Sequence, residues 1–196
     1  MAGPNPSHAQ AAAAPPEAAA LPVVIVLASG QGQRFLASGG TGSKLQALLA
    51  GKPVLDHTLA AVRESGLRWH LEDAGHPGMG DSIAAAVRAT LGAAGWLILP
   101  GDLPLVRPDT LRAVARAVRA QGAVVPVFAG RRGHPVGFGA DCGAALSRLQ
   151  GAQGAAGVLR TLEVDEMPVD DVGVVTDIDT VQALAEAARL LERPRT

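Results

Sequence analysis

The stretch that decides the fold is Val23–Arg34, VVIVLASGQGQR, in which a continuous apolar run passes directly into a glycine-containing loop. Val23–Leu27 is short and mostly β-branched, which is typical of a central strand covered on both faces. The loop then turns through Gly30 and Gly32, residues that permit unusual dihedral angles and a close approach of the backbone to a ligand. This combination predicts an anion-binding loop at the carboxyl end of a buried strand.

From this strand onward, short apolar runs alternate with stretches of helical periodicity, which predicts an α/β fold. The expected helices are Val54–Glu64, Ser82–Leu91 with Asp81 as its N-cap, Pro108–Ala120, Cys142–Leu149, Ala155–Leu162 and Thr180–Glu192. The further expected strands are Trp69–Leu71, Trp96–Leu99, Val124–Phe128, Pro135–Phe138 and, as the last one, Val174–Ile178. Because neither a repeat nor a second core interrupts the series, we expect one domain over residues 21–196.

Residues 1–20 differ in composition from the rest, with nine Ala and four Pro and no periodic apolar face. Such a segment buries too little surface to offset its ordering entropy, so we expect a disordered extension. A signal peptide would need a basic N-terminal region, and no Lys or Arg precedes Arg34. The apolar run 23–27 is too short to span a bilayer. We therefore expect a soluble, cytoplasmic protein with no membrane partner.

The composition of the 196-residue chain narrows the function classes further. The 17 Lys and Arg against 18 Asp and Glu give a formal net charge of −1, which argues against the broad basic face of a nucleic-acid-binding protein. The single Cys cannot form an internal disulfide, which fits a reducing compartment. We expect no nucleic acid among the partners.

Two cations accompany the glycine loop. Arg34 offers a planar fork suited to phosphate oxygens, and Lys44 adds a point charge beyond a Ser- and Gly-rich stretch at 38–43. Two standard glycine motifs are absent, since Phe35 stands where the dinucleotide fingerprint needs a third glycine, and Leu45 follows Lys44 where a P-loop needs Ser or Thr. The alternative to phosphate binding is a tight strand-to-helix turn with incidental charges.

Carboxylates follow two of the expected strands. Asp102 comes just after the Trp96–Leu99 strand, at the edge of an α/β sheet where ligands bind, and an aspartate there commonly ligates Mg²⁺. Asp177 and Asp179 close the expected last strand and would share a face if that segment were extended. The alternatives are that Asp102 closes a turn, and that one of the other two aspartates, or Thr180, caps the following helix.

Six motifs occur in a fixed order along the chain: LASGQGQR at 27–34 with Lys44, GKPVLDH at 51–57, GMGDS at 78–82, PGDLP at 100–104, RGHP at 132–135 and DIDT at 177–180. Together they resemble nucleotidyltransferases that act on nucleoside triphosphates, and are most similar to the molybdenum cofactor cytidylyltransferase branch of the MobA-like NTP transferases. The resemblance covers residues 21–190. It implies a Rossmann-like three-layer sandwich with a mostly parallel sheet, like that of nucleotide-diphospho-sugar transferases. It also implies Mg²⁺-dependent transfer of CMP from CTP to the terminal phosphate of molybdopterin, with release of pyrophosphate.

Carried over position by position, the resemblance implies three groups of site residues. The nucleotide would be bound by Leu27, Ala28, Ser29, Gly30, Gly32, Arg34, Lys44, Gly80, Asp81, Ser82 and Asp102, of which Arg34, Lys44 and Asp102 would be catalytic. Mg²⁺ would be held by Asp102 and Asp179, with Asp177 open as an alternative to Asp179, and Gly133, His134 and Pro135 would shape the acceptor side. The implied partners are a nucleoside triphosphate, with CTP favoured, the molybdenum cofactor, and a recipient molybdoenzyme.

The sequence departs from the family pattern at three places. Arg34 and Lys44 are ten positions apart, so Lys44 lies on a longer loop than usual. Ala28-Ser29-Gly30 replaces the Ala-Ala-Gly of cytidylyl enzymes and the Ala-Gly-Gly of guanylyl enzymes, which leaves the choice between CTP and GTP open. Only fifteen residues separate Val62 from Gly78, where the family normally places an additional strand and helix. Either the sheet lacks an element or the chain is a shortened variant.

Two other classes of function remain as alternatives. The first is guanylyl transfer, or nucleotidyl transfer to a sugar or polyol phosphate, by the same fold. The second is a non-catalytic accessory protein that binds a nucleotide or the molybdenum cofactor.

Overall fold

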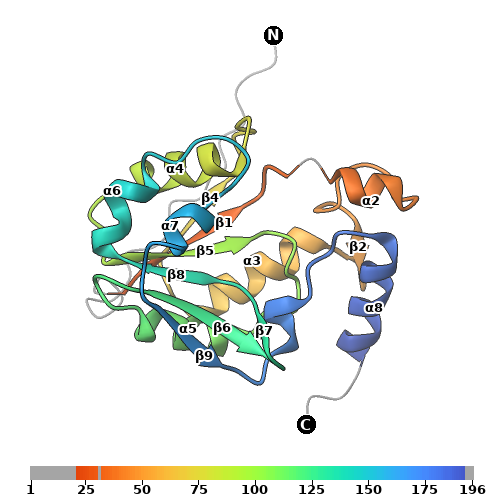
Figure 1. The fold of residues 1–196 in the computed structure, drawn as a ribbon. Coiled ribbons are helices and arrows are strands. Elements are labelled where there is room, and N and C mark those ends of the chain that lie inside the picture. Colours follow the sequence, from red (N-terminus) through yellow and green to blue (C-terminus); the bar gives the residue numbers. More distant parts are fainter. Residues whose placement is uncertain (1–20, 31, 193–196) are drawn as a thin grey trace.

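The computed structural model describes residues 21–30 and 32–192 (Figure 1). The expected extension at 1–20 lies outside the described residues. A seven-stranded sheet has the order β4-β1-β5-β8-β6-β7, with β9 paired to the other side of β6. Its strands are β1 Val23–Leu27, β4 Trp69–Glu72, β5 Gly95–Pro100, β6 Ala123–Phe128, β7 Arg131–Arg132, β8 Val136–Gly139 and β9 Val164–Pro168. A separate small hairpin joins β2 Leu48–Leu49 to β3 Lys52–Pro53.

Strand direction in the sheet is mostly parallel. β1 pairs in parallel with β4 and β5, and β6 pairs in parallel with β9. β8 lies antiparallel between β5 and β6, and the short β7 is antiparallel to β6. The parallel strands therefore all end at the same edge of the sheet.

Helices cover both faces of the sheet and make a three-layer sandwich, as expected (Figure 1). The helices are α2 Gln33–Ala37, α3 Val54–Ser65, α4 Met79–Ala89, α5 Pro108–Ala117, α6 Gly143–Leu146, α7 Ala156–Leu159 and α8 Val181–Glu192. Two 3₁₀ turns, η1 Ala140–Cys142 and η2 Val172–Val175, complete the set. None of the helices within 21–30 and 32–192 is long and apolar enough to cross a lipid bilayer.

The alternation of side chains along β1 shows why this strand is apolar throughout. Val24 and Val26 belong to the core under α3 and α5, whereas Val23 and Ile25 belong to the core under α4 and α6. All four side chains are buried. A strand at the centre of a sandwich needs apolar residues on both faces, which the uninterrupted run Val23–Leu27 supplies.

A third, smaller cluster lies at the carboxyl edge of the sheet. It joins α2, the β2–β3 hairpin and α8 through Phe35, Leu49, Val54, Ile178 and Ala187. In Figure 1, α2 and α8 stand together at one end of the molecule, beside β2. The chain thereby brings its first loop and its last helix to the same place.

The expected last strand, Val174–Ile178, is wrong. Val172–Val175 instead forms η2, because the Asp171 carboxylate accepts a hydrogen bond from Gly173 N (2.9 Å) and closes a tight turn. Val174 is apolar because it packs against the core from outside the sheet. The strand that joins the sheet is β9. It was not predicted because its exposed Asp165 and Glu166 interrupt the apolar pattern by which the other strands were recognised.

The expected N-cap of α4 is also wrong. The helix begins at Met79 rather than Ser82, with the extended Gly78 as its N-cap, so Asp81 lies within the first turn. The Asp81 carboxylate accepts a hydrogen bond from Gly151 N (2.9 Å) instead of capping its own helix. The interval between α3 and α4 contains one strand, β4, and no helix, and β4 forms an edge of the sheet.

Candidate functional site

The loops after β1 and β5 leave the sheet side by side. Leu27 is aligned with Pro100 in the parallel register, and Gly101 N donates a hydrogen bond to Leu27 O (2.8 Å). A Cβ on Gly101 would lie 3.0 Å from that same oxygen, which is tighter than most Cβ contacts, so this close approach favours glycine. From α3, Thr58 Oγ1 donates to Gly101 O (2.9 Å). These contacts fix the backbone immediately before Asp102.

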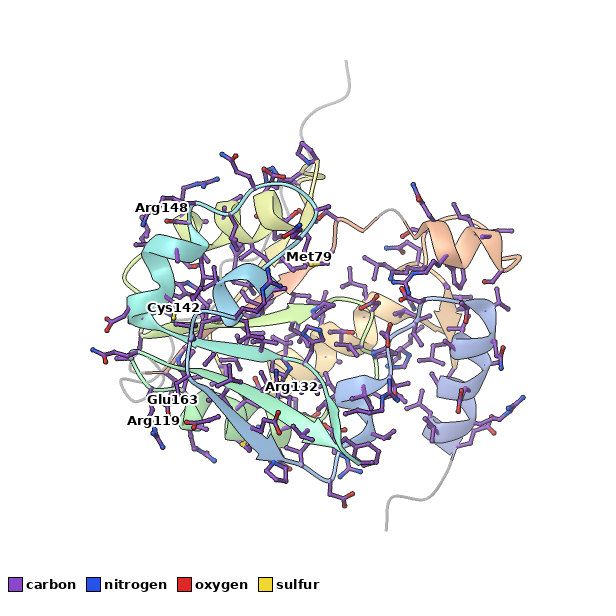
Figure 2. All side chains as sticks on the ribbon, in the orientation of Figure 1. Met79, Arg119, Arg132, Cys142, Arg148 and Glu163 are labelled. Carbon is purple, nitrogen blue, oxygen red and sulfur yellow. The ribbon has the colours of Figure 1, made fainter. Side chains whose placement is uncertain are left out.

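A cavity of about 320 Å³ opens between these loops and the start of α4. The predicted residues that line it are Leu27, Ser29, Gly30, Lys44, Ser82 and Asp102. The further lining residues are Gly78 and Met79 of the GMGDS motif, Pro100 and Gly101 of the PGDLP motif, and four residues outside the motifs, Leu45, His76, Pro77 and Ala152. Figure 2 labels Met79 beside the start of α4, and its side chain is half exposed. His76, Pro77 and Ala152 could be found only from the folded structure, because none of the sequence motifs contains them.

Lys44 joins the two carboxylates that the sequence singled out. Its Nζ donates to Asp102 Oδ2 and to Asp179 Oδ1, the latter at 2.6 Å. The Lys44 side chain is 13% exposed, so this contact is largely shielded from solvent. Burial works to lower the pKa of Lys44, but Asp102 and Asp179 together hold it above its ordinary value. The ammonium group is therefore charged and held between two carboxylates.

Arg34 completes the cluster from the solvent side. Its guanidinium contacts Asp179 Oδ2 at 2.6 Å, and its side chain is 79% exposed. Burial opposes ionisation of Asp179, but Lys44, Asp177 and Arg34 lower its pKa. Partial burial and the hydrogen bond to Asp179 raise the pKa of Asp177. Of these two aspartates, Asp179 is the one that both cations contact.

The last segment of the chain is fastened to the loop after β5. Ile178 N donates to Asp102 O (2.9 Å), which places Asp179 next to Asp102. Thr180 Oγ1 accepts from Ala183 N (3.1 Å), so the expectation that Thr180 could cap the last helix is confirmed. Val181 N also donates to Ser38 Oγ (3.0 Å), which ties the start of α8 to the end of α2.

The oxygen atoms of Asp102 differ in their surroundings. Oδ2 accepts from Lys44, whereas the buried Oδ1 has no hydrogen-bond partner among the described residues. An unpartnered buried carboxylate oxygen is costly unless a cation or water contacts it. No group of three or more His, Cys, Asp or Glu side chains within the described residues forms a ready metal cage. One or two carboxylates are what Mg²⁺ takes from a protein when phosphates and water complete its shell, so Asp102 and Asp179 fit such an ion.

The GMGDS segment divides into two parts. Ser82 lines the cavity and its Oγ lies 3.0 Å from Ser29 Oγ, which links α4 to the first loop. Gly80 N donates to Gly151 O (2.8 Å), and Asp81 accepts from Gly151 N. A side chain at Gly78 would collide with that same carbonyl. Gly80 and Asp81 thus hold the 150–152 loop against α4, and neither lines the cavity.

The remaining predicted residues of the first loop also lie outside the cavity wall. Ala28 N donates to Glu72 O (2.9 Å), which continues the pairing of β1 with β4. Gly32 has a positive φ of 61°, and a Cβ built on it would lie 3.5 Å from Lys44 Cγ. Gly32 therefore turns the chain beside the Lys44 side chain.

The predicted acceptor-side segment packs behind Asp102. Gly133 N donates to Pro126 O and His134 N to Val174 O, both at 2.8 Å, and the His134–Pro135 peptide is cis. His134 is half-buried, and this burial lowers its pKa against the opposing effects of the Asp102 charge and a hydrogen bond with the Ile98 backbone. None of Gly133, His134 and Pro135 lines the cavity.

Two other hollows contain few or none of the predicted residues. One of about 210 Å³ adjoins the first at His76 and Pro77 and is lined on its far side by Arg88 and Arg148. A larger one, of about 430 Å³, is lined by Arg119, Ala120, Gln121, Gly122, Glu163 and Asp165. Figure 2 shows Arg119 and Glu163 at the end of the molecule opposite α2 and α8. Because neither hollow contains Lys44 or Asp102, the cavity between the β1 and β5 loops is the candidate functional site.

Solved structures with this fold include a nucleotidyl transferase, Mth528, from Methanothermobacter thermautotroptrophicus, with a TM-score of 0.74 at 20% identity over 89% of this chain and 99% of that one. Rv0371c from Mycobacterium tuberculosis H37Rv has a TM-score of 0.72 at 23% identity, over 86% of this chain and 97% of that one. A manganese complex of Rv0371c has a TM-score of 0.67 at 22% identity, over 86% of this chain and 98% of that one. Molybdopterin-guanine dinucleotide biosynthesis protein A from Archaeoglobus fulgidus has a TM-score of 0.59 at 20% identity, over 86% of this chain and 97% of that one. These likenesses show the fold.

The sequence comparisons define the family. Residues 60–172 match the MobA-like NTP transferase domain, and the chain belongs to that family. The family resemblance and the fold class expected from the sequence are therefore confirmed. Among curated proteins, the bifunctional protein GlmU of Geobacter sulfurreducens is 33% identical over 139 residues, which are 59% of this chain and 29% of GlmU. The chain thus matches only a minor part of the length of that relative.

Proposed function

We propose that the protein transfers CMP from CTP to the terminal phosphate of molybdopterin in the molybdenum cofactor and releases pyrophosphate. The observation that carries this proposal is that Lys44 and Asp102 line a cavity between the ends of β1 and β5, and that Lys44 contacts both Asp102 and Asp179. Ligands of open α/β sheets bind at such an edge. Membership of the MobA-like NTP transferase family supports the reaction class.

The chemistry asks the protein for positioning and charge compensation rather than for a nucleophile. An oxygen of the acceptor phosphate forms a bond to the α-phosphorus, and the bond from that phosphorus to the bridging oxygen of pyrophosphate breaks. Because an ionised phosphate is already a competent nucleophile, the site needs no strong general base. Lys44 and Arg34 are the cations placed to compensate the charge of the triphosphate.

We assign the metal site to Asp102 and Asp179, on the basis of the unpartnered Asp102 Oδ1 and the adjacent second carboxylate. When bound there, Mg²⁺ would neutralise phosphate charge and align the triphosphate. The manganese complex of Rv0371c supports a divalent cation in this fold without deciding which one.

The base and ribose are assigned to the end of the cavity formed by Ser29, Gly78, Met79 and Ser82. Small side chains and backbone groups dominate this wall, and the paired hydroxyls of Ser29 and Ser82 can each donate or accept. CTP is favoured because the motifs resemble the cytidylyl branch. Guanylyl transfer is the second candidate, and the Archaeoglobus fulgidus neighbour, a molybdopterin-guanine dinucleotide biosynthesis protein, favours it.

The test is an incubation of the purified protein with Mg²⁺, molybdenum cofactor and each of the four nucleoside triphosphates in turn, with pyrophosphate measured over time. We expect release with CTP that depends on the cofactor. Release with GTP alone would mean that the donor is GTP rather than CTP, and would still support nucleotidyl transfer to the cofactor. Release only when a sugar 1-phosphate replaces the cofactor would move the acceptor assignment. No release with any triphosphate and either acceptor would contradict the enzymatic function.

A further inference from the structure

Lys44 occupies the space between the carboxylates that would hold the metal. Of the four oxygens of Asp102 and Asp179, three contact a cation of the protein itself: Asp102 Oδ2 and Asp179 Oδ1 contact Lys44, and Asp179 Oδ2 contacts Arg34. Only Asp102 Oδ1 is unpartnered. The charges of these two carboxylates and two cations balance, and a third carboxyl group, that of Asp177, is hydrogen-bonded to Asp179 beside them.

We propose that Lys44 and the divalent cation are alternative occupants of this cluster, so that the site excludes the free metal ion and accepts it only together with a nucleoside triphosphate. The inference rests on the proposed function and deepens it, because it names the metal–triphosphate complex as the ligand. Lys44 would leave the carboxylates for the triphosphate as the metal takes its place.

The charges decide the direction of this exchange. If a divalent cation entered while Lys44 stayed, positive charge would exceed negative charge in a site where both carboxylates are mostly shielded from water, which is costly. A metal–triphosphate complex still carries net negative charge, so its entry supplies a new partner for the ammonium. Lys44 is thus stabilised beside the carboxylates without ligand and beside the phosphates with it.

The side chain of Lys44 is suited to move while its backbone stays. The next residue, Leu45, is buried and its carbonyl accepts from Leu55 N (3.0 Å), which anchors the chain at this point. The ammonium stands at the end of a flexible four-carbon stem, and Lys44 also lines the cavity. Arg34 on the exposed side of Asp179 keeps that carboxylate partly compensated throughout.

The test measures binding of Mn²⁺ alone, by the loss of its free EPR signal, to the full-length protein and to Lys44→Met. The chain has only two lysines, and the exposed Lys52 provides the matched control variant Lys52→Met. We expect the unmodified protein and Lys52→Met to bind Mn²⁺ equally weakly. We expect Lys44→Met to bind it about tenfold more tightly or better, within the usual range of coupling between two ligands.

Two further variants locate the effect and guard against misfolding. The double variant Lys44→Met, Asp102→Asn should lose the gain in Mn²⁺ affinity, because it removes one of the two carboxylates. Lys44→Gln, a neutral polar variant of similar length, should reproduce the gain if Lys44→Met does not fold. Lys44→Arg should bind Mn²⁺ as weakly as the unmodified protein, since it keeps the cation.

The second readout is the linkage between metal and nucleotide. Adding CTP should raise the Mn²⁺ affinity of the unmodified protein by about tenfold or more, and that of Lys44→Met by much less. Lys44→Met and Lys44→Gln that bind free Mn²⁺ no more tightly than the unmodified protein would overturn the inference. Because the metal-only titration uses no nucleotide or acceptor, a failure of the transfer assay would leave its result intact.

Discussion

Two buried aspartates near the carboxyl edge of the sheet have opposite surroundings. Asp171, which follows β9, is 2% exposed, and its carboxylate accepts hydrogen bonds from Arg107 N (2.9 Å), Thr110 Oγ1 (2.7 Å) and Gly173 N (2.9 Å). Asp102, which follows β5, is 8% exposed, and only one of its oxygens has a partner, Lys44. The Asp171 carboxylate accepts from three neutral donors, with the Arg107 guanidinium 3.9 Å from Oδ1, whereas the Asp102 carboxylate has a single partner, the ammonium group of Lys44.

This difference separates a carboxylate that supports the fold from one that is available for a ligand. The donors of Asp171 belong to the start of α5 and to the turn η2, so this buried carboxylate joins two elements. Asp102 lines the cavity and retains an oxygen for a further partner. A buried polar atom without a hydrogen-bond partner is a stronger indication of function than one with partners, because the fold normally supplies hydrogen bonds to a purely structural group.

The largest expected effect is on catalysis in Asp102→Asn. The amide keeps the shape of the side chain but removes the charge needed for the metal and for Lys44, so nucleotidyl transfer should fall by about a thousandfold or more. The midpoint of thermal unfolding should change by only a few degrees. Steady-state pyrophosphate release and a thermal melt measure the two quantities. Activity within tenfold of the unmodified protein would mean that Asp102 does not hold the metal.

Asp171→Asn should reverse this pattern. The amide nitrogen of Asn cannot accept the hydrogen bonds that a carboxylate oxygen of Asp171 accepts, so one side of the side chain would lie against unpaired donors. The free energy of unfolding should therefore fall by about 3 kcal/mol. Urea titration followed by circular dichroism measures the loss, and the neighbouring exposed Asp170→Asn serves as the control, with an expected change below about 0.5 kcal/mol. The fraction that remains folded should keep its kcat/KM. A loss of kcat/KM without a loss of stability would place Asp171 in the site.

Thr110→Val removes a single donor from Asp171 and keeps the shape of the side chain. Thr110 is buried, and its Oγ1 bond leads to Asp171 Oδ2, which still accepts from Arg107 N after the substitution. The free energy of unfolding should therefore fall by about 1–2 kcal/mol, less than in Asp171→Asn. The same urea titration measures this loss. In the double variant Thr110→Val, Asp171→Asn the loss of stability should be smaller than the sum of the losses in the two single variants. Full additivity would mean that the hydroxyl stabilises the fold through another contact.

The contrast between these aspartates also marks what could be predicted from the sequence. The strand–loop–carboxylate pattern around Leu27 and Asp102 depends on local order along the chain, and the structure brings those residues together. Asp171 carried no such signal, because two of its three hydrogen-bond donors, Arg107 and Thr110, lie more than sixty positions away in the sequence. A carboxylate that closes two loops is recognisable only from tertiary structure.

The errors have the same physical origin. Val174–Ile178 has the composition of a strand, but burial outside the sheet and the Asp171 turn decide its conformation. β9 was missed because an edge strand needs few apolar residues. Asp81 was expected to serve α4 and instead binds the 150–152 loop, a long-range contact that helix-capping rules do not foresee.

The smallest expected effect concerns His134, whose Nδ1 is the other buried side-chain atom without a partner in the described part of the chain. Burial lowers its pKa in the fold, whereas in the unfolded chain it titrates near 6.5. Below that pH the unfolded state binds the additional proton, so the contribution of His134 to stability is present above pH 6.5 and lost as the pH falls. Between pH 7 and 5.5 the loss should be at most about 1 kcal/mol, the value for a His134 that binds no proton in the folded state. Urea titrations of the unmodified protein and His134→Asn across this range isolate it, because the other histidines contribute equally to both. Parallel curves would mean that His134 accepts a proton in the fold as readily as in the unfolded chain, and that this side of Asp102 is wetter than the packing of His134 indicates.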